Sequence, residues 1–300
     1  MNKLQDIIIK QDEIESVVTG LREGFKEQLV AGLSGSARAL FISSIYDQLN
    51  HSTIVLTYNL LQAQKMYDDL SQLMEEDSLY LFPANELIAA ELGVASPELK
   101  AQRIEALNAL TRNEKCVIIV PMAGLRKMLP PKSVWSKYQL HFKVGKDISL
   151  DDVLQKLIIM GYNRVDMVAT PGDFSMRGGI LDVYPITEAD PIRIELFDTE
   201  VDSIRTFSAD DQRSREKLNE VNIGPATEIL VDRSSLQKAV KTVESQLSQT
   251  IAKVKNQKTK ERLAQNIGFD LEKLRNGQRP EQLYKYLSVI YEQPSSLLDY

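Results

Sequence analysis

The segment with the clearest chemical potential is Gly32-Leu33-Ser34-Gly35-Ser36-Ala37-Arg38-Ala39, which lies between an expected strand and an expected helix. This is the layout of a phosphate-binding loop, whose working form reads G-x-x-x-x-G-K-[ST]. Here Ala37, Arg38 and Ala39 stand where glycine, lysine and a hydroxyl residue are needed. Arginine can still meet a phosphate, but alanine cannot ligate Mg²⁺, and the methyl group of Ala37 restricts the close backbone approach that glycine permits. The segment therefore predicts a degenerate, inactive nucleotide loop.

Other reactive side chains do not suggest a second site. No acidic pair of the D-E-x-[DH] kind follows a predicted strand, so the motif that would hold Mg²⁺ beside such a loop is also missing. Cys116 lies in an apolar run, where burial raises the thiol pKa. His51 and His141 have no Cys or carboxylate at metal-ligand spacing. We therefore expect no catalytic residue, no metal site and no cofactor in this region.

The interpretation of the chain as a stand-alone α/β enzyme with an unrecognised site has the weakest support. It would need titratable groups that converge in a cleft. Asp166, Asp173 and Asp182 are the candidates. Their positions fit turns and strand ends better than a catalytic pair.

Composition and charge narrow the class of protein. The chain has 300 residues, enough for two or three domains, and carries 42 acidic against 36 basic residues. This balance gives no positive field for nucleic acid, and Lys253–Lys260, the nearest thing to a basic patch, has acidic flanks and no interleaved aromatics. Neither a membrane span nor a secretory signal is visible, so we expect a cytoplasmic protein. The closing stretch, Gln293–Tyr300, has no tapering polar tail, which suggests a chain cut from something longer.

Apolar runs separated by amphipathic stretches predict alternating strands and helices as far as Pro121. We expect helices over Gln11–Glu27, Ala37–Gln48, Leu60–Met74 and Pro97–Leu110, and strands over Gln28–Ala31, Thr53–Thr57, Leu79–Phe82 and Cys116–Pro121. This alternation implies a mostly parallel sheet with helices on both faces. Beyond residue 140, a helix over Ser149–Met160 and closely spaced strands to about Phe207 imply an α+β domain on an antiparallel sheet. From about Asp232 the pattern is helical.

The strand Ile192–Phe197 presents two different faces. Alternation places Ile192, Ile194 and Leu196 toward the core and Arg193, Glu195 and Phe197 toward solvent. An aromatic beside an arginine and a glutamate is typical of an interface anchor, although a helix or loop could equally cover Phe197. If these side chains point outward, replacing them should change folding stability by no more than about 0.5 kcal/mol, whereas Leu196→Ala should cost roughly 2 to 5 kcal/mol.

Two stretches resemble a signature shared by UvrB and the transcription-repair coupling factors. They are Met176-Arg177-Gly178-Gly179-Ile180-Leu181-Asp182-Val183-Tyr184-Pro185 and Ile192-Arg193-Ile194-Glu195-Leu196-Phe197-Asp198-Thr199-Glu200-Val201-Asp202-Ser203-Ile204-Arg205, and the similarity covers most of residues 20 to 230. UvrB keeps a working phosphate loop and a long aromatic hairpin that clamps damaged DNA. This chain lacks the loop chemistry and has only Ala84–Ser96 before the helix at Pro97. It is therefore more similar to the coupling factors, and a UvrB-class DNA-binding ATPase fragment is the alternative.

The resemblance implies an α/β fold in three parts. We expect a degenerate, helicase-type P-loop-like parallel-sheet domain over residues 1–141, an inserted α+β antiparallel-sheet domain over 142–226, and a mostly helical, truncated part over 227–300. The resemblance further implies that the inserted domain docks UvrA, the excision-repair protein, through positions matching Arg177, Arg193 and Phe197, with support from Glu195. Gly178-Gly179 could form a bulge, so parity does not give the face of Arg177. RNA polymerase, DNA, ATP and Mg²⁺ would bind other domains of the full-length protein. The resemblance also implies that one of those domains masks this docking surface.

Overall fold

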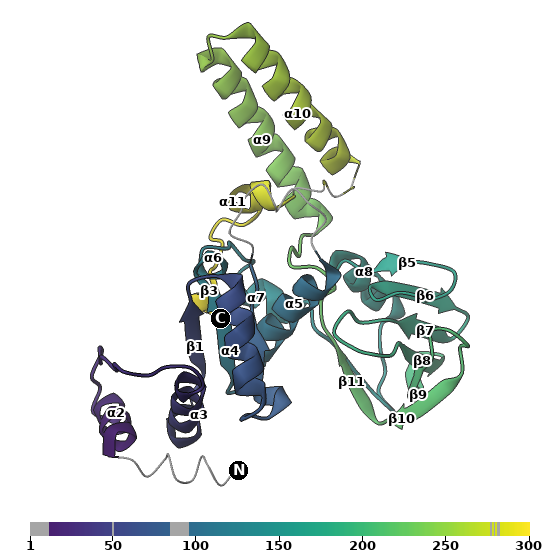
Figure 1. Cartoon of the computed structure of the whole chain (residues 1–300). Helices are drawn as coiled ribbons and strands as arrows, with labels where there is room; N and C mark the ends of the chain where they lie inside the picture. Colours follow the sequence, from purple (N-terminus) through teal and green to yellow (C-terminus); the bar gives the residue numbers. More distant parts are fainter. Residues whose placement is uncertain (1–11, 50, 85–95, 277, 279, 281–282) are drawn as a thin grey trace. The chain divides into compact units, whose positions relative to one another are not determined.

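Five buried residues of strand β3 (Val117–Pro121) form the centre of a three-stranded parallel sheet. The strand pairs with β1 (Thr53–Thr57) on one side and with β2 (Leu79–Leu81) on the other. A continuous apolar run is what a strand covered on both faces requires, and the run Val117-Ile118-Ile119-Val120 meets this condition. The computed structural model describes residues 12–49, 51–84, 96–276, 278, 280 and 283–300, and Figure 1 shows its elements.

Helices pack against this sheet. They are α3 (Ala37–Leu49), α4 (Leu60–Ser71), α5 (Pro97–Thr111) and α6 (Met122–Leu125), with a 3₁₀ turn, η1, over Glu76–Ser78, while α2 (Asp12–Arg22) contacts α3. The side chain of Asn59 accepts a hydrogen bond from the backbone N–H of Gln62 and thereby caps α4. Ala39 of α3 and Ala63 and Leu70 of α4 share a core cluster with Leu79, Leu81, Val117 and Ile119 of the sheet. The expected parallel sheet is confirmed at these three strands.

The strand predicted over Gln28–Ala31 is wrong. These residues are exposed and have no strand geometry, and Leu29 is 94% exposed. The side-chain amide of Gln28 donates to the carbonyl of Val17 instead, at 3.0 Å, so the segment is tied to α2. The short apolar run Leu29-Val30-Ala31 gives too little burial to hold a further strand at the sheet edge. The short connection expected between Phe82 and Pro97 falls on residues 85–95, which lie outside the described residues.

A six-stranded sheet dominates the next part of the chain, with strand order β10-β9-β8-β7-β6-β5. The strands are β5 (Asn163–Arg164), β6 (Asp173–Arg177), β7 (Ile180–Val183), β8 (Ile192–Phe197), β9 (Glu200–Phe207) and β10 (Ser214–Leu218). All neighbours are antiparallel except the short pair β5–β6. Helix α8 (Leu150–Ile159) buries Val153 and Leu157, and the second sheet pairs β4 (Leu140–Lys143) with β11 (Glu220–Ile223). The expected α+β domain is confirmed in its sheet and helix.

The last part is helical, as expected. Helices α9 (Arg233–Lys253) and α10 (Gln257–Arg275) run side by side in Figure 1. The other elements of the described residues are α7 (Lys132–Lys137), α11 (Leu287–Ile290) and the turns η3 (Leu283–Tyr286) and η4 (Leu297–Asp299). Asp232 and Asn256 cap α9 and α10 through their side-chain oxygens. The chain divides into two compact units, Met1–Lys127 and Met128–Tyr300. The finer division at residues 141 and 226 stays a prediction.

Candidate docking surface on the antiparallel sheet

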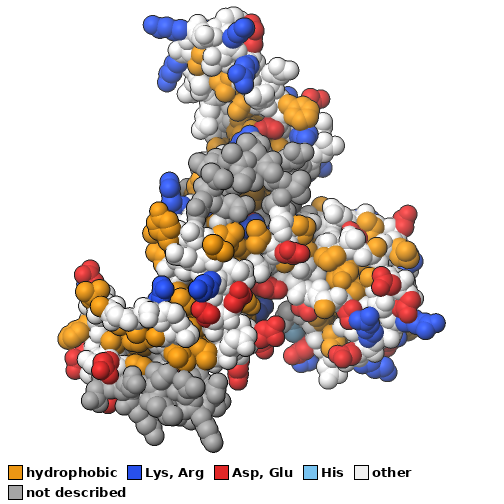
Figure 2. Space-filling view, in the orientation of Figure 1, with side chains coloured by type: hydrophobic (Ala, Val, Ile, Leu, Met, Phe, Trp, Pro, Cys, Tyr) orange, Lys and Arg blue, Asp and Glu red, His pale blue; other side chains and the backbone are white. Residues whose placement is uncertain are grey.

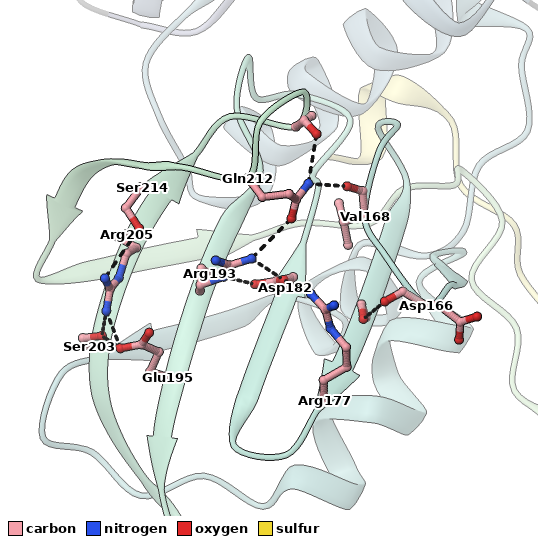
Figure 3. A network of polar contacts seen from close by, with 12 residues as sticks. Asp166, Val168, Arg177, Asp182, Arg193, Glu195, Ser203, Arg205, Gln212 and Ser214 are labelled. Carbon is pink, nitrogen blue, oxygen red and sulfur yellow. Dashed lines mark hydrogen bonds and ion pairs between the residues drawn. The ribbon is translucent and has the colours of Figure 1, made fainter.

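The six-stranded sheet has one apolar face and one charged face. Buried side chains of the apolar face include Leu181, Ile192, Ile194 and Ile204. The opposite side, which we call the charged face, carries Arg177, Asp182, Arg193, Glu195, Ser203 and Arg205 (Figure 3). In Figure 2, acidic and basic side chains lie side by side over this domain. Because strand pairing fixes these residues on neighbouring strands, the charged face is a rigid array.

Asp182 is the centre of this array. Its side chain is only 1% exposed, and Arg193 donates to it through Nε at 2.7 Å to Oδ1 and Nη2 at 2.8 Å to Oδ2. The guanidinium also lies 4.4 Å from the centre of the buried Phe207 ring. The hydrogen bonds to Asp182 raise the pKa of Arg193 above its ordinary value. Such a two-pronged pair fixes both side chains.

Arg193 is therefore less accessible than the strand pattern predicts. Its side chain is 16% exposed, because Gln212 covers it from the loop before β10. Gln212 accepts from Arg193 at 3.4 Å and donates to the carbonyl of Val168 at 3.2 Å. Arg193 is thus not the outward-pointing side chain on which the small expected effect on stability depends, and replacing it would leave the buried Asp182 without its main partner.

Arg177 lies on the same charged face. Gly178 and Gly179 form the two-residue turn of the β6–β7 hairpin, and Arg177 pairs directly with Ile180, so the bulge considered from the sequence is absent here. Gly178 has φ +59°, a conformation that favours glycine. Arg177 Nη2 lies 3.5 Å from Asp182 Oδ2, and the Arg177 side chain is 55% exposed. Arg193 already neutralises Asp182, so Arg177 is the less tightly bound of the two arginines at this carboxylate.

Glu195 is held from β9. Ser203 donates to its Oε2 at 2.7 Å, and Arg205 forms an ion pair with the same oxygen. The hydrogen bond from Ser203 and the charge of Arg205 keep the pKa of Glu195 below its ordinary value. The carboxylate is 31% exposed, so it remains reachable from solvent.

Phe197 is 79% exposed, which settles the even choice left by the strand pattern in favour of an open side chain. Leu196 departs from the pattern: the pairing of β8 with β9 shifts between Glu195 and Leu196, and Leu196 is only half-buried. Its backbone N–H donates to the carbonyl of Gly179 at 2.7 Å. Leu196 is thus not the core residue that alternation predicts, because the irregularity breaks the period of two.

Sequence reasoning missed four contributors to this surface: Ser203, Arg205, Gln212 and the pairing role of Asp182. From the sequence, Asp182 is a catalytic candidate. In the structure it lies within β7 and forms an ion pair with Arg193. Asp173 accepts from the backbone and hydroxyl of Thr170, at 3.0 and 2.9 Å, as a turn residue does. The backbone carbonyl of Asp166 accepts from Ser175 at 2.9 Å. None of these contacts joins two of the three aspartates.

The glycine-containing loop differs from its predicted setting, because no strand precedes it among the described residues. Gly32 and Gly35 have φ of +84° and +55°, and Ala37 begins α3. Gly35 and Arg38 line a hollow of about 430 Å³ with residues of β1 and α4. Ala39 is 1% exposed within the sheet core. The position of the expected metal-binding hydroxyl is therefore a packing position, while the likeness to a degenerate nucleotide loop stays a prediction.

Cys116 is buried, and His141 contacts a neighbouring side chain. Burial raises the pKa of Cys116 to about 11. His141 Nδ1 lies 2.7 Å from the side-chain oxygen of Asn222. Within the described ranges, no cluster of three or more His, Cys, Asp or Glu side chains is arranged to hold a metal ion. No helix in this part of the chain is long and apolar enough to cross a membrane.

Comparison with known proteins concerns both the six-stranded sheet and the chain as a whole. A family model described as the UvrB interaction domain matches residues 140–229, which contain the whole six-stranded sheet. The transcription-repair-coupling factor of Bacillus subtilis (strain 168) is 49% identical over 300 residues, which is 100% of this chain and 26% of that relative. Those of Staphylococcus aureus (strain MRSA252) and Staphylococcus haemolyticus (strain JCSC1435) are each 38% identical over 285 residues, 92% of this chain and 24% of the relative.

The chain thus spans about a quarter of the length of the curated relatives that it matches. The similarity nevertheless runs through all of the chain and includes an interaction domain with the strand-pair signature. The chain belongs to the transcription-repair-coupling factor family, as its UvrB-like amino-terminal module.

Proposed function

We propose that this region is a non-catalytic adaptor that recruits UvrA to stalled RNA polymerase for transcription-coupled nucleotide excision repair. Phe197 and Arg177 make the direct contacts, and Arg193 and Glu195 hold the surface in register. ATP, Mg²⁺, DNA and RNA polymerase bind elsewhere in the full-length protein. The match to a UvrB interaction domain supports the assignment to a docking role.

One observation carries the proposal. The exposed Phe197 (79%) and Arg177 (55%) belong to a sheet in which Arg193 is held by two hydrogen bonds to the buried carboxylate of Asp182. An exposed phenylalanine gains no favourable interaction with water. Aromatic and arginine side chains are the usual anchors of protein interfaces. The locked pair gives the anchors a rigid base, which lowers the ordering cost of association.

The test is a titration of UvrA with the wild-type chain and with Phe197→Ala, Arg177→Ala and Arg213→Ala. Truncating an anchor typically costs about 2 kcal/mol or more, roughly thirtyfold in affinity. We expect this loss for Phe197→Ala and Arg177→Ala. Arg213 is 85% exposed in side chain and lies on a loop, so its variant controls for the loss of one positive charge. Equal affinity for all four proteins would contradict the proposed surface.

A further inference from the structure

We propose that Arg205 is an additional docking residue that captures a carboxylate from an acidic surface of the partner. The inference rests on the proposed function and adds to it the chemistry that the partner must present. Arg205 lies on β9, in the row of the charged face next to Arg193. Three observations on this residue indicate that the free domain leaves it under-satisfied.

The first observation is a like-charge pair. Arg193 and Arg205 are direct cross-strand partners on β8 and β9. Like charges in this position destabilise a sheet, because the side chains stand next to each other on the same face. Asp182 balances Arg193 with two hydrogen bonds, whereas Arg205 is balanced through one nitrogen by a single oxygen of the partly exposed Glu195.

The second observation concerns the hydrogen bonds of Arg205. One guanidinium nitrogen, Nη2, meets both Glu195 and Ser203, and Nη1 has a long contact of 3.5 Å to Ser214 Oγ. Nε is buried and has no acceptor among the described residues. Leaving a buried donor without an acceptor costs free energy that burial elsewhere must offset. The free domain therefore does not use the full hydrogen-bonding capacity of this arginine.

The third observation is the local charge. The charged face carries Arg177, Arg193 and Arg205, with Lys217 of β10 directly opposite Arg205, against Asp182 and Glu195, an excess of two positive charges. By contrast, residues 141–226 contain 16 acidic and 10 basic residues, so the surrounding domain is negative. A positive face on a negative domain complements an acidic surface and rejects a basic one.

A carboxylate from the partner would reduce the excess of positive charge and give Nη1 a closer acceptor than Ser214. The Arg205 side chain is 25% exposed, so an incoming group can reach its outer edge. The carboxylate would balance the second arginine of the cross-strand pair and accept a charge-assisted hydrogen bond from its Nη1. Glu195 would remain bound to Ser203 and keep the guanidinium oriented.

This assignment separates stability from binding. Arg205→Met keeps much of the apolar stem and removes the like-charge contact and the unsatisfied Nε. We therefore expect the melting temperature to stay the same or to rise, because Glu195 retains Ser203 and is 31% exposed. Affinity for UvrA should fall about tenfold or more, since a charge-assisted contact is lost.

The experiment measures UvrA affinity and melting temperature for the wild-type chain, Arg205→Met, Arg205→Lys and Arg213→Met. Arg205→Lys keeps the charge without the forked geometry and should recover part of the affinity. Arg213→Met makes the same charge change at a side chain that is 85% exposed, and should stay within about twofold of wild type.

Two results would overturn the inference while leaving the docking role intact: wild-type affinity in Arg205→Met, or an equal loss in Arg213→Met. A lower melting temperature of Arg205→Met, with unchanged affinity in the folded fraction, would assign Arg205 to the fold alone. If the wild-type chain does not bind UvrA, the proposed function fails, and the role of Arg205 fails with it.

Discussion

The pair Asp182–Arg193 gives the most quantitative test of the charged face. Arg193→Ala removes two hydrogen bonds of 2.7 and 2.8 Å from a carboxylate that is 1% exposed. Breaking a buried pair by removing one partner costs about 3 to 5 kcal/mol. Arg193 retains 16% exposure, and Arg177 stands 3.5 Å from the same carboxylate as a partial substitute. We therefore expect a loss of roughly 2 to 4 kcal/mol, below the full value for a closed site.

Urea denaturation followed by the fluorescence of Trp135 measures this loss, because the chain has a single tryptophan and it is buried in the same compact unit. Arg177→Ala is the matched control, since its side chain is 55% exposed and should cost no more than about 0.5 kcal/mol. In a double-mutant cycle with Asp182→Asn and Arg193→Met, the double variant should be less destabilised than the sum of the single ones. Additive effects, or a cost for Arg193→Ala as small as that of the control, would show that Arg193 and Asp182 do not stabilise the sheet as a pair.

Three further outcomes are expected. ATP turnover should equal that of a blank, and hydrolysis that disappears in Arg38→Ala would show that the loop works. Duplex DNA should bind more weakly than about 1 μM at roughly 150 mM salt, because the net charge of −6 gives counterion release little to act on; tighter binding with a steep salt slope would oppose this. Asp232→Ala should cost about 1 kcal/mol at pH 7 by removing the cap of α9. The hydrogen bond from the Ser235 N–H lowers the pKa of Asp232, so this cost should vanish as pH falls through the folded pKa, and a cost that persists in acid would contradict the capping role.

The sequence predicts much of the fold because apolar periodicity is local. The strand over Thr53–Thr57 agrees residue for residue, and the helices from Ala37, Leu60 and Pro97 begin where expected. The strand predicted over Gln28–Ala31 is wrong, since a short apolar run can match a strand pattern without finding a partner to pair with.

The site was predictable in part. Alternation along β8 places Ile192 and Ile194 in the core, and it identifies the exposed Phe197 as an interface candidate. It fails at Leu196, because a shift of pairing leaves no mark in the residue types. The bond between Asp182 and Arg193 depends on the register of two strands, which the sequence does not specify. For this reason Arg193, expected at the surface, is largely covered.

We propose above that the six-stranded sheet docks UvrA through its charged face and Phe197. The most direct measurement is a titration of UvrA with the wild-type chain and Phe197→Ala at two salt concentrations, with the melting temperature of each chain recorded. Phe197 is 79% exposed, so we expect an unchanged melting temperature and an affinity about thirtyfold weaker for the variant at both salt concentrations. No binding by the wild-type chain, or equal binding by both proteins, would contradict it.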